Sequence, residues 1–137
     1  MKKREPVSHI MSTNVHCVLP TQNLLEVREL MDKKGVRHVP VLAGADLVGI
    51  ISRTDVMRAS YGVSRLEEEE QKQSLRGLRA EQVMSPNPVA VGPDTSIRES
   101  AELLAELDFS ALPVLDQGVL IGIVTTTDLI RYLLEQY

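Results

Sequence analysis

The chain has 137 residues, of which 43% are hydrophobic, and a mean hydropathy of −0.05, a composition typical of a soluble globular protein. Its net charge of −4 and isoelectric point near 5.4 argue against a nucleic-acid or membrane partner, since no long basic face is available. The sequence has no run of about 18 apolar residues and no apolar stretch typical of a signal peptide. We therefore expect a cytoplasmic protein, in which the single Cys17 packs as a small apolar residue.

The first expected elements are a short strand and a helix. Val15–Val18 is an apolar run typical of a strand, and Pro20 ends it. Asn23 lies three residues before Glu26, which is the spacing of a capping box at a helix N-terminus. Apolar residues then recur with a helical period, at Leu24, Val27, Leu30 and Met31.

A hairpin and a second helix are expected next. Residues 37–42 and 47–51 are apolar runs suited to strands, and a turn over 43–46 joins them. Pro40 has no N–H to donate, so it should lie near the start of its strand or on a sheet edge. The helix begins near Thr54 and Asp55, whose side chains suit a helix N-terminus by capping and by charge.

Residues 59–82 are a connector of different character. Leu66–Lys72 contains strong helix formers and a possible ion pair between Glu68 and Lys72, four residues apart. We expect an exposed helix that ends near Gly77. Its acidic run is interpreted as a solvated face, with a partner-binding patch as the alternative.

The second half of the chain repeats the first. Residues 10–58 align with 83–131 at a constant offset of 73 without a gap, and 17 of 49 aligned positions are identical where roughly three would be expected by chance. The helix start at Ser96 and Glu99 and the strands 111–115 and 120–124 all have counterparts in the first copy. We therefore predict two repeats, 1–68 with core 10–58 and 69–137 with core 83–131, that share one compact core about a pseudo-two-fold axis.

Each copy is expected to be a β-α-β-β-α unit, which gives an α/β (α+β) fold of two pseudo-two-fold-related repeats packed through their sheets. Each copy has a Met-Ser pair at its start, a strand ending in Pro-Val-Leu, and a closing Gly-x-x-(Ser/Thr)-x-x-Asp segment at 49–55 and 122–128. In these motifs the chain resembles the tandem CBS domain pair, or Bateman module. The resemblance covers both copies. It implies that the protein senses adenosine-containing ligands, such as AMP, ADP, ATP or S-adenosylmethionine, in clefts between the repeats, and that it requires no cofactor.

The repeated residues suit such a ligand on chemical grounds. A carboxylate at a strand-to-helix junction, such as Asp55 or Asp128, can accept both hydroxyls of a ribose. Gly49 and Gly122 would let the backbone approach the sugar. Phosphate groups could be bound by the N–H groups at the helix start and by the nearby hydroxyls, those of Ser52, Thr54, Thr125 and Thr127. The alternative is that the aspartates only cap helices.

By the same resemblance, each cleft joins the Asp segment of one copy to the first two strands of the other. The cleft that we favour combines Thr125, Thr126, Thr127 and Asp128 with Val15, His16, Val36, Arg37 and His38. The second combines Ser52, Arg53, Thr54 and Asp55 with Pro88, Val89, Phe109, Ser110 and Ala111. The first is favoured because Arg37 and His38 bring positive charge for phosphates, whereas the second has only Arg53. With no Trp and one Phe, the chain is expected to hold adenine between aliphatic side chains.

Two other functions compete with ligand sensing. Catalysis is not expected, because Asp55 and Asp128 are copies of each other and should lie in different clefts, and the three histidines lack metal-binding spacing. A ligand-free module for protein interaction or dimerisation is the stronger alternative. A homodimer is expected in either case, although its surplus apolar residues could instead pack inside the monomer or under the connector. These residues are Leu129, Ile130, Leu133, Leu134 and Tyr137 in the last helix and Leu25, Leu103 and Leu107 in the first helix of each copy.

Overall fold

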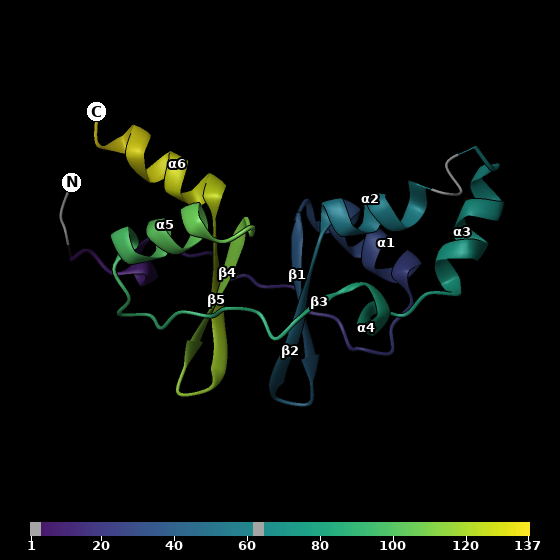
Figure 1. The fold of residues 1–137 in the computed structure, drawn as a ribbon, viewed down its shortest axis with the longest axis horizontal. Coiled ribbons are helices and arrows are strands. Elements are labelled where there is room, and N and C mark those ends of the chain that lie inside the picture. The colour runs from purple at the N-terminus through teal and green to yellow at the C-terminus, as the bar shows by residue number, and fades with distance from the viewer. Residues whose placement is uncertain (1–3, 62–64) are drawn as a thin grey trace. The chain divides into compact units, whose positions relative to one another are not determined.

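The computed structural model describes residues 4–61 and 65–137 and has a mixed α/β fold with two small antiparallel sheets (Figure 1). Its described residues form two compact units. The central unit comprises His16–Pro88, and the terminal unit comprises the chain up to Val15 together with Val89–Tyr137. The predicted domains, 1–68 and 69–137, are defined by the repeated sequence. The two compact units are defined by contacts between residues, so their boundaries differ from those of the repeats.

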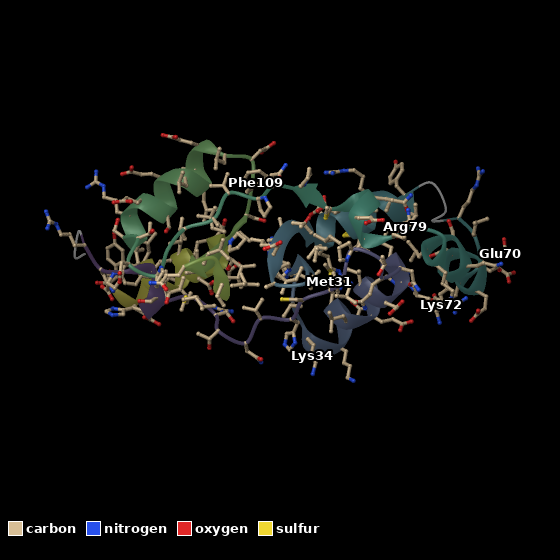
Figure 2. The ribbon with its side chains drawn as sticks, turned by 90° about the horizontal axis from the view of Figure 1, so that it is seen from below. Met31, Lys34, Glu70, Lys72, Arg79 and Phe109 are labelled. Atoms are coloured by element: carbon tan, nitrogen blue, oxygen red, sulfur yellow. The ribbon has the colours of Figure 1, made fainter. Side chains whose placement is uncertain are left out.

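The central unit has a three-stranded antiparallel sheet in the order β1-β2-β3. Its strands are β1 (His38–Ala43), β2 (Asp46–Ser52) and β3 (Ser85–Pro86), and its helices are α1 (Leu24–Lys34), α2 (Arg53–Ser60), α3 (Glu68–Arg76) and α4 (Ala80–Val83). Helix α1 contacts both α2 and α3. The core lies between these helices and the sheet, and its fully buried members include Leu24, Met31 and Ile51 (Met31 is labelled in Figure 2).

The terminal unit repeats this plan around a two-stranded sheet. It contains a short 3-10 helix, η1 (Val7–His9), helices α5 (Ile97–Glu106) and α6 (Thr126–Glu135), and strands β4 (Ala111–Asp116) and β5 (Val119–Thr125). The hairpins of the two units have the same register, and the irregularity between Val41 and Leu42 recurs between Val114 and Leu115. The predicted hairpins and helices are therefore confirmed.

Side-chain caps determine where the helices begin. The Asn23 side chain accepts a hydrogen bond from the Glu26 N–H at 3.0 Å, and the Ser96 hydroxyl accepts one from the Glu99 N–H at 3.0 Å. These bonds satisfy N–H groups that have no partner inside the helix. The predicted helix starts in both copies are thus correct. Helix α1 ends at Gly35, whose φ of 65° is readily adopted only by glycine.

The first strand predicted for the first copy, Val15–Val18, is wrong. Only Val18 pairs there, in a single parallel bridge to Val41 of β1, and Val91 and Val114 repeat that bridge in the terminal unit. The Val18 N–H donates to the Pro40 carbonyl, and the Val18 carbonyl accepts from Leu42. Because Pro40 has no N–H, regular pairing cannot extend along this side of β1. Pro40 therefore lies at a sheet edge, as predicted.

The connector forms the expected helix, α3, whose C-cap is Gly77. Most of α3 is exposed, and Figure 2 shows Glu70 and Lys72 on it, but Leu75 is fully buried in the central core. The predicted pair between Glu68 and Lys72 does not form. Glu68 lies 3.7 Å from Arg28 of α1, and Lys72 lies 4.0 Å from Glu69. A helix packed against α1 gives Glu68 a tertiary partner that an isolated helix would lack.

The Met-Ser segments of the two copies are exchanged between the hairpins. Ser12, from the first copy, forms two backbone hydrogen bonds with Ile123 of β5, at 2.8 and 3.0 Å. Ser85, from the second copy, pairs with Ile50 of β2. Each hairpin is therefore extended by the segment that opens the other copy. This exchange explains why the compact units do not follow the order of the repeats.

The repeated glycines make room for this exchange, a role different from the predicted approach to a sugar. A Cβ placed on Gly122 would lie 2.6 Å from the Met11 sulfur and 3.0 Å from the Ser12 carbonyl oxygen. Met84 occupies the corresponding space over Gly49. Both distances at Gly122 are shorter than ordinary van der Waals contacts, so only glycine allows the segment to approach the strand this closely.

Substituting Gly122 with alanine is expected to lower the free energy of unfolding by about 1–3 kcal/mol, because the new methyl group overpacks this contact. Chemical denaturation would measure the change. Gly92→Ala is the control, since a Cβ there meets no atom closer than 3.8 Å. Adding Met11→Ala to Gly122→Ala should restore part of the loss. Equal stability of the Gly122 and Gly92 variants would contradict this account of the packing.

Residues 5–7 are packed into the terminal unit. Val7 is fully buried, and its N–H donates to the Thr95 carbonyl at 2.7 Å. The Tyr132 hydroxyl of α6 donates to the Glu5 carboxylate at 2.7 Å, and this hydrogen bond, with burial, raises the pKa of Tyr132 above its ordinary value. Within the described residues, no helix has the length and apolar character needed to cross a membrane.

Candidate functional site

In the central unit, Asp55 lies at the junction between β2 and α2. Ser52 is the N-cap of α2, and its hydroxyl accepts a hydrogen bond from the Asp55 N–H at 3.1 Å. In return, Asp55 Oδ2 accepts from the Ser52 N–H at 2.8 Å. Asp55 Oδ1 lies 3.6 Å from the Arg58 guanidinium. The capping box fixes the Asp55 side chain beside the first turn of α2.

The terminal unit has the same arrangement between β5 and α6. The Thr125 hydroxyl accepts from the Asp128 N–H at 3.2 Å, and Asp128 Oδ2 accepts from the Thr125 N–H at 2.8 Å. Asp128 is partly buried, and its Oδ1 accepts no hydrogen bond from any residue that the structure describes. Both aspartates cap helices, as predicted by the alternative in which capping is their only role. Asp128 nevertheless keeps one carboxylate oxygen for another donor.

The start of the preceding strand lies beside each junction. The Arg53 N–H donates to the Arg37 carbonyl at 2.8 Å, and His38 pairs with Ser52 across the hairpin. In the terminal unit, the Thr126 N–H donates to the Ser110 carbonyl at 3.0 Å. Each unit thus gathers a capped aspartate, hydroxyl-bearing residues (Ser52 and Thr54, or Thr125–Thr127) and the first residues of the neighbouring strand.

The residues of each predicted cleft are distributed over both units. Of the favoured set, Val15 and Thr125–Asp128 belong to the terminal unit, and His16 and 36–38 belong to the central unit. Of the second set, 52–55 and Pro88 belong to the central unit, and Val89 and 109–111 belong to the terminal unit. Within a unit, the structure brings together residues that the prediction divided between the clefts. The assignment of residues to two clefts stays a prediction.

The two junctions differ in charge. Arg53 forms an ion pair with Asp32 of α1. The guanidinium of Arg37 is exposed and has no hydrogen-bond or ion-pair partner within 4–61 and 65–137. The corresponding positions beside α6 are Thr126 and Ser110, which carry no charge. Positive charge is therefore concentrated at the central junction.

Apolar surface is exposed on the terminal unit. Phe109, labelled in Figure 2, and Val89 are 39% and 37% exposed.

Two other features involve none of the predicted site residues. Cys17 is partly buried, and this burial raises the pKa of its thiol. A hollow of about 350 Å³ lies elsewhere on the terminal unit and is lined by Arg4, Glu5, Pro6 and His9, none of them a predicted site residue.

Comparison with known proteins identifies the repeat. The family model for the CBS domain matches residues 7–62 and, a second time, residues 80–135. This chain belongs to the CBS domain family. The two matches together cover most of the sequence, so the protein contains a tandem CBS pair. A pair of this kind is typical of non-catalytic regulatory modules, and in some relatives it forms a region of an enzyme.

Individual relatives of this CBS pair differ in length. The chain is 33% identical over 116 residues to inosine-5'-monophosphate dehydrogenase of Korarchaeum cryptofilum, covering 84% of this chain but 21% of that enzyme. It also spans only 48% of protein MJ1225 of Methanocaldococcus jannaschii. By contrast, CBS domain-containing protein YhcV of Bacillus subtilis is 28% identical over 123 residues, which is 90% of this chain and 81% of YhcV.

Among solved structures, the CBS-pair protein CBSX2 of Arabidopsis thaliana, in complex with AMP, is similar to this chain throughout. The two proteins are 29% identical with a TM-score of 0.78, and the similarity covers 96% of this chain and 98% of CBSX2. The CBS pair is thus comparable in extent to a protein whose structure contains AMP.

Proposed function

We propose that this CBS pair is a regulatory module that binds an adenosine-containing ligand and transmits binding through the geometry of a homodimer. The observation that carries the proposal is the pair of capped aspartates at matching strand-to-helix junctions, of which Asp128 keeps an oxygen that no residue in the described part of the chain contacts by a hydrogen bond or ion pair. The AMP complex of CBSX2 supports the choice of ligand class. AMP, ADP, ATP and S-adenosylmethionine all carry the ribose that such a carboxylate would bind.

The capping box prepares Asp128 for this task. Its Oδ2 is held by the Thr125 N–H at 2.8 Å, so the carboxylate does not lose rotational freedom when Oδ1 binds a ribose hydroxyl. A hydrogen bond to a charged carboxylate is stronger than one between neutral groups. Thr127, in the first turn of α6, is exposed and supplies a further hydroxyl.

Phosphate groups would be bound by the cationic and hydroxyl side chains. In the favoured cleft, Arg37 supplies a guanidinium that no described residue neutralises, which suits a phosphate oxygen pair. In the second cleft, Arg53 is already paired with Asp32. The difference in available charge supports the favoured cleft for ligands that carry phosphates.

Transmission through a dimer is supported by an exposed apolar face on α6. Ile130 and Leu134 are 52% and 68% exposed, and their counterparts in the first copy, Met57 of α2 and its C-cap Tyr61, are 64% and 82% exposed. Leu129 and Leu25 are instead buried in the cores of their own units. For these two residues, the alternative that the surplus apolar side chains pack inside the monomer is correct. The same exposed face also supports the alternative function, a dimerisation module without a ligand.

A thermal-shift series distinguishes the two functions. A ligand that binds only the folded protein stabilises it by about 2.7 kcal/mol at a hundred times its Kd, which should raise the melting temperature by roughly 8 °C or more. AMP, ADP, ATP or S-adenosylmethionine should produce this rise, and the matched guanosine phosphates should produce less. An unchanged melting temperature with every adenosine compound at millimolar concentration would favour the ligand-free module.

A further inference from the structure

The ion pair between Arg53 and Asp32 links α2 to α1 in the central unit. Arg53 is the first residue of α2, directly after the N-cap Ser52 and two residues before Asp55. Both partners are accessible to solvent, with 43% of the Arg53 side chain and 53% of the Asp32 side chain exposed. An ion pair this exposed contributes little to folding and exchanges its partners readily.

The terminal unit shows that this pair is not needed to build the junction. Thr126 and Ala105 occupy the positions of Arg53 and Asp32 there, and neither is charged. The hydrogen bond from the N-cap N–H to the aspartate is nevertheless 2.8 Å long in both units. The backbone bond to the preceding strand is also present in both, from Arg53 to Arg37 and from Thr126 to Ser110. Arg53 and Asp32 therefore add charge to a junction that is complete without them.

We infer that Asp32 is a specificity-determining residue, which lowers the affinity of the central junction for phosphate-bearing ligands by competing with phosphate for Arg53. The inference rests on the proposed function. It adds a residue that determines how strongly the junction prefers a ligand with or without a phosphate. Arg53 donates to Asp32 Oδ1 through Nη1, and a guanidinium also uses this nitrogen when it binds a phosphate through a planar pair of N–H donors, so a phosphate bound there competes with Asp32. Asp32 would leave the binding of uncharged adenosine unchanged, because a nucleoside has no group that needs Arg53.

The test compares AMP with adenosine by calorimetry on the full chain. Asp32→Asn should raise AMP affinity roughly two- to fivefold, as expected for an exposed ion pair, and leave adenosine affinity unchanged. Asp46→Asn is the matched control, because it removes the same charge from the opposite end of β2. Arg53→Ala should weaken AMP binding, and Asp32→Asn should have no effect in the Arg53→Ala background.

Three results would overturn the inference. Unchanged AMP affinity in Asp32→Asn would show that Asp32 does not compete, and lower affinity would show that it positions Arg53 for the ligand; in both cases the proposed function would stand. An equal gain in AMP affinity in Asp46→Asn would show that the effect comes from the change in net charge and not from Asp32. If neither AMP nor adenosine binds to any variant, the proposed function fails, and the inference fails with it.

Discussion

Replacing Asp128 with alanine is expected to weaken AMP binding roughly a hundredfold or more. The carboxylate would accept two charge-assisted hydrogen bonds from the ribose, each contributing about 1.5–3 kcal/mol, and alanine removes both. Isothermal titration calorimetry of the wild-type and variant proteins measures the difference. Asp55→Ala should have a smaller effect, because both carboxylate oxygens of Asp55 already have protein partners, the Ser52 N–H and the Arg58 guanidinium.

A second substitution at the same position separates binding from folding. Asp128→Ala also removes the acceptor of the Thr125 N–H, which should cost about 1 kcal/mol of stability. Asp128→Asn keeps an oxygen acceptor but loses the charge, so it should preserve most of the stability while still weakening the binding of AMP. Unchanged AMP affinity in both Asp128→Ala and Asp55→Ala would reject the assignment of these aspartates to the ligand site.

Placing charge on the exposed face of α6 is expected to convert a dimer into a monomer. Wild-type protein at micromolar concentration should scatter light as twice the 15.2 kDa chain mass. Leu134→Glu, at a side chain that is 68% exposed in the chain, should raise the dimer dissociation constant more than roughly a hundredfold. The effect is large because a two-fold symmetric interface contains the substitution twice.

The control for this change is Val119→Glu. Val119 is apolar and 61% exposed, like Leu134, but it lies at the start of β5 rather than on α6. This variant should remain dimeric, and both variants should unfold with stability close to that of the wild type. A wild-type mass of one chain, with and without AMP, would contradict signalling through dimer geometry.

Most of the secondary structure could be predicted from the sequence because local signals determine it. The caps at Asn23 and Ser96 and the turns between the hairpin strands act within a few residues, and the repeat presents each signal twice. The strand at Val15–Val18 was predicted wrongly for the opposite reason. Its apolar pattern is typical of a strand, but pairing depends on a distant partner in which Pro40 lacks the required N–H.

The packing of the Met-Ser segments could not be predicted from local patterns. Met11 and Gly122 are 111 positions apart, and nothing near either residue indicates the other. One signal was present in the alignment, since Met11 and Gly49 recur together as Met84 and Gly122. That recurrence shows that both residues belong to the repeated unit, but it does not show which copy supplies the partner.

The candidate site was predicted unevenly. The positions of the aspartates and the hydroxyl-bearing caps at helix starts were predicted correctly because the strand-to-helix junction is a local feature, whereas their assignment to a ligand site stays a prediction. The proximity of Arg37 to Arg53 could have been obtained from the hairpin register, in which His38 lies opposite Ser52. The pairing of Arg53 with Asp32 had no such signal, because Asp32 lies on a different helix and has no charged counterpart in the second copy.

Calorimetric titration of the wild-type chain with AMP tests the central claim most directly, because it measures binding, affinity and stoichiometry in one experiment. The proposal predicts saturable binding of at least one AMP per chain, with adenosine binding more weakly and GMP more weakly than AMP. No saturable binding of AMP, adenosine or S-adenosylmethionine at concentrations up to about 1 mM, which corresponds to a binding free energy weaker than about 4 kcal/mol, would contradict it.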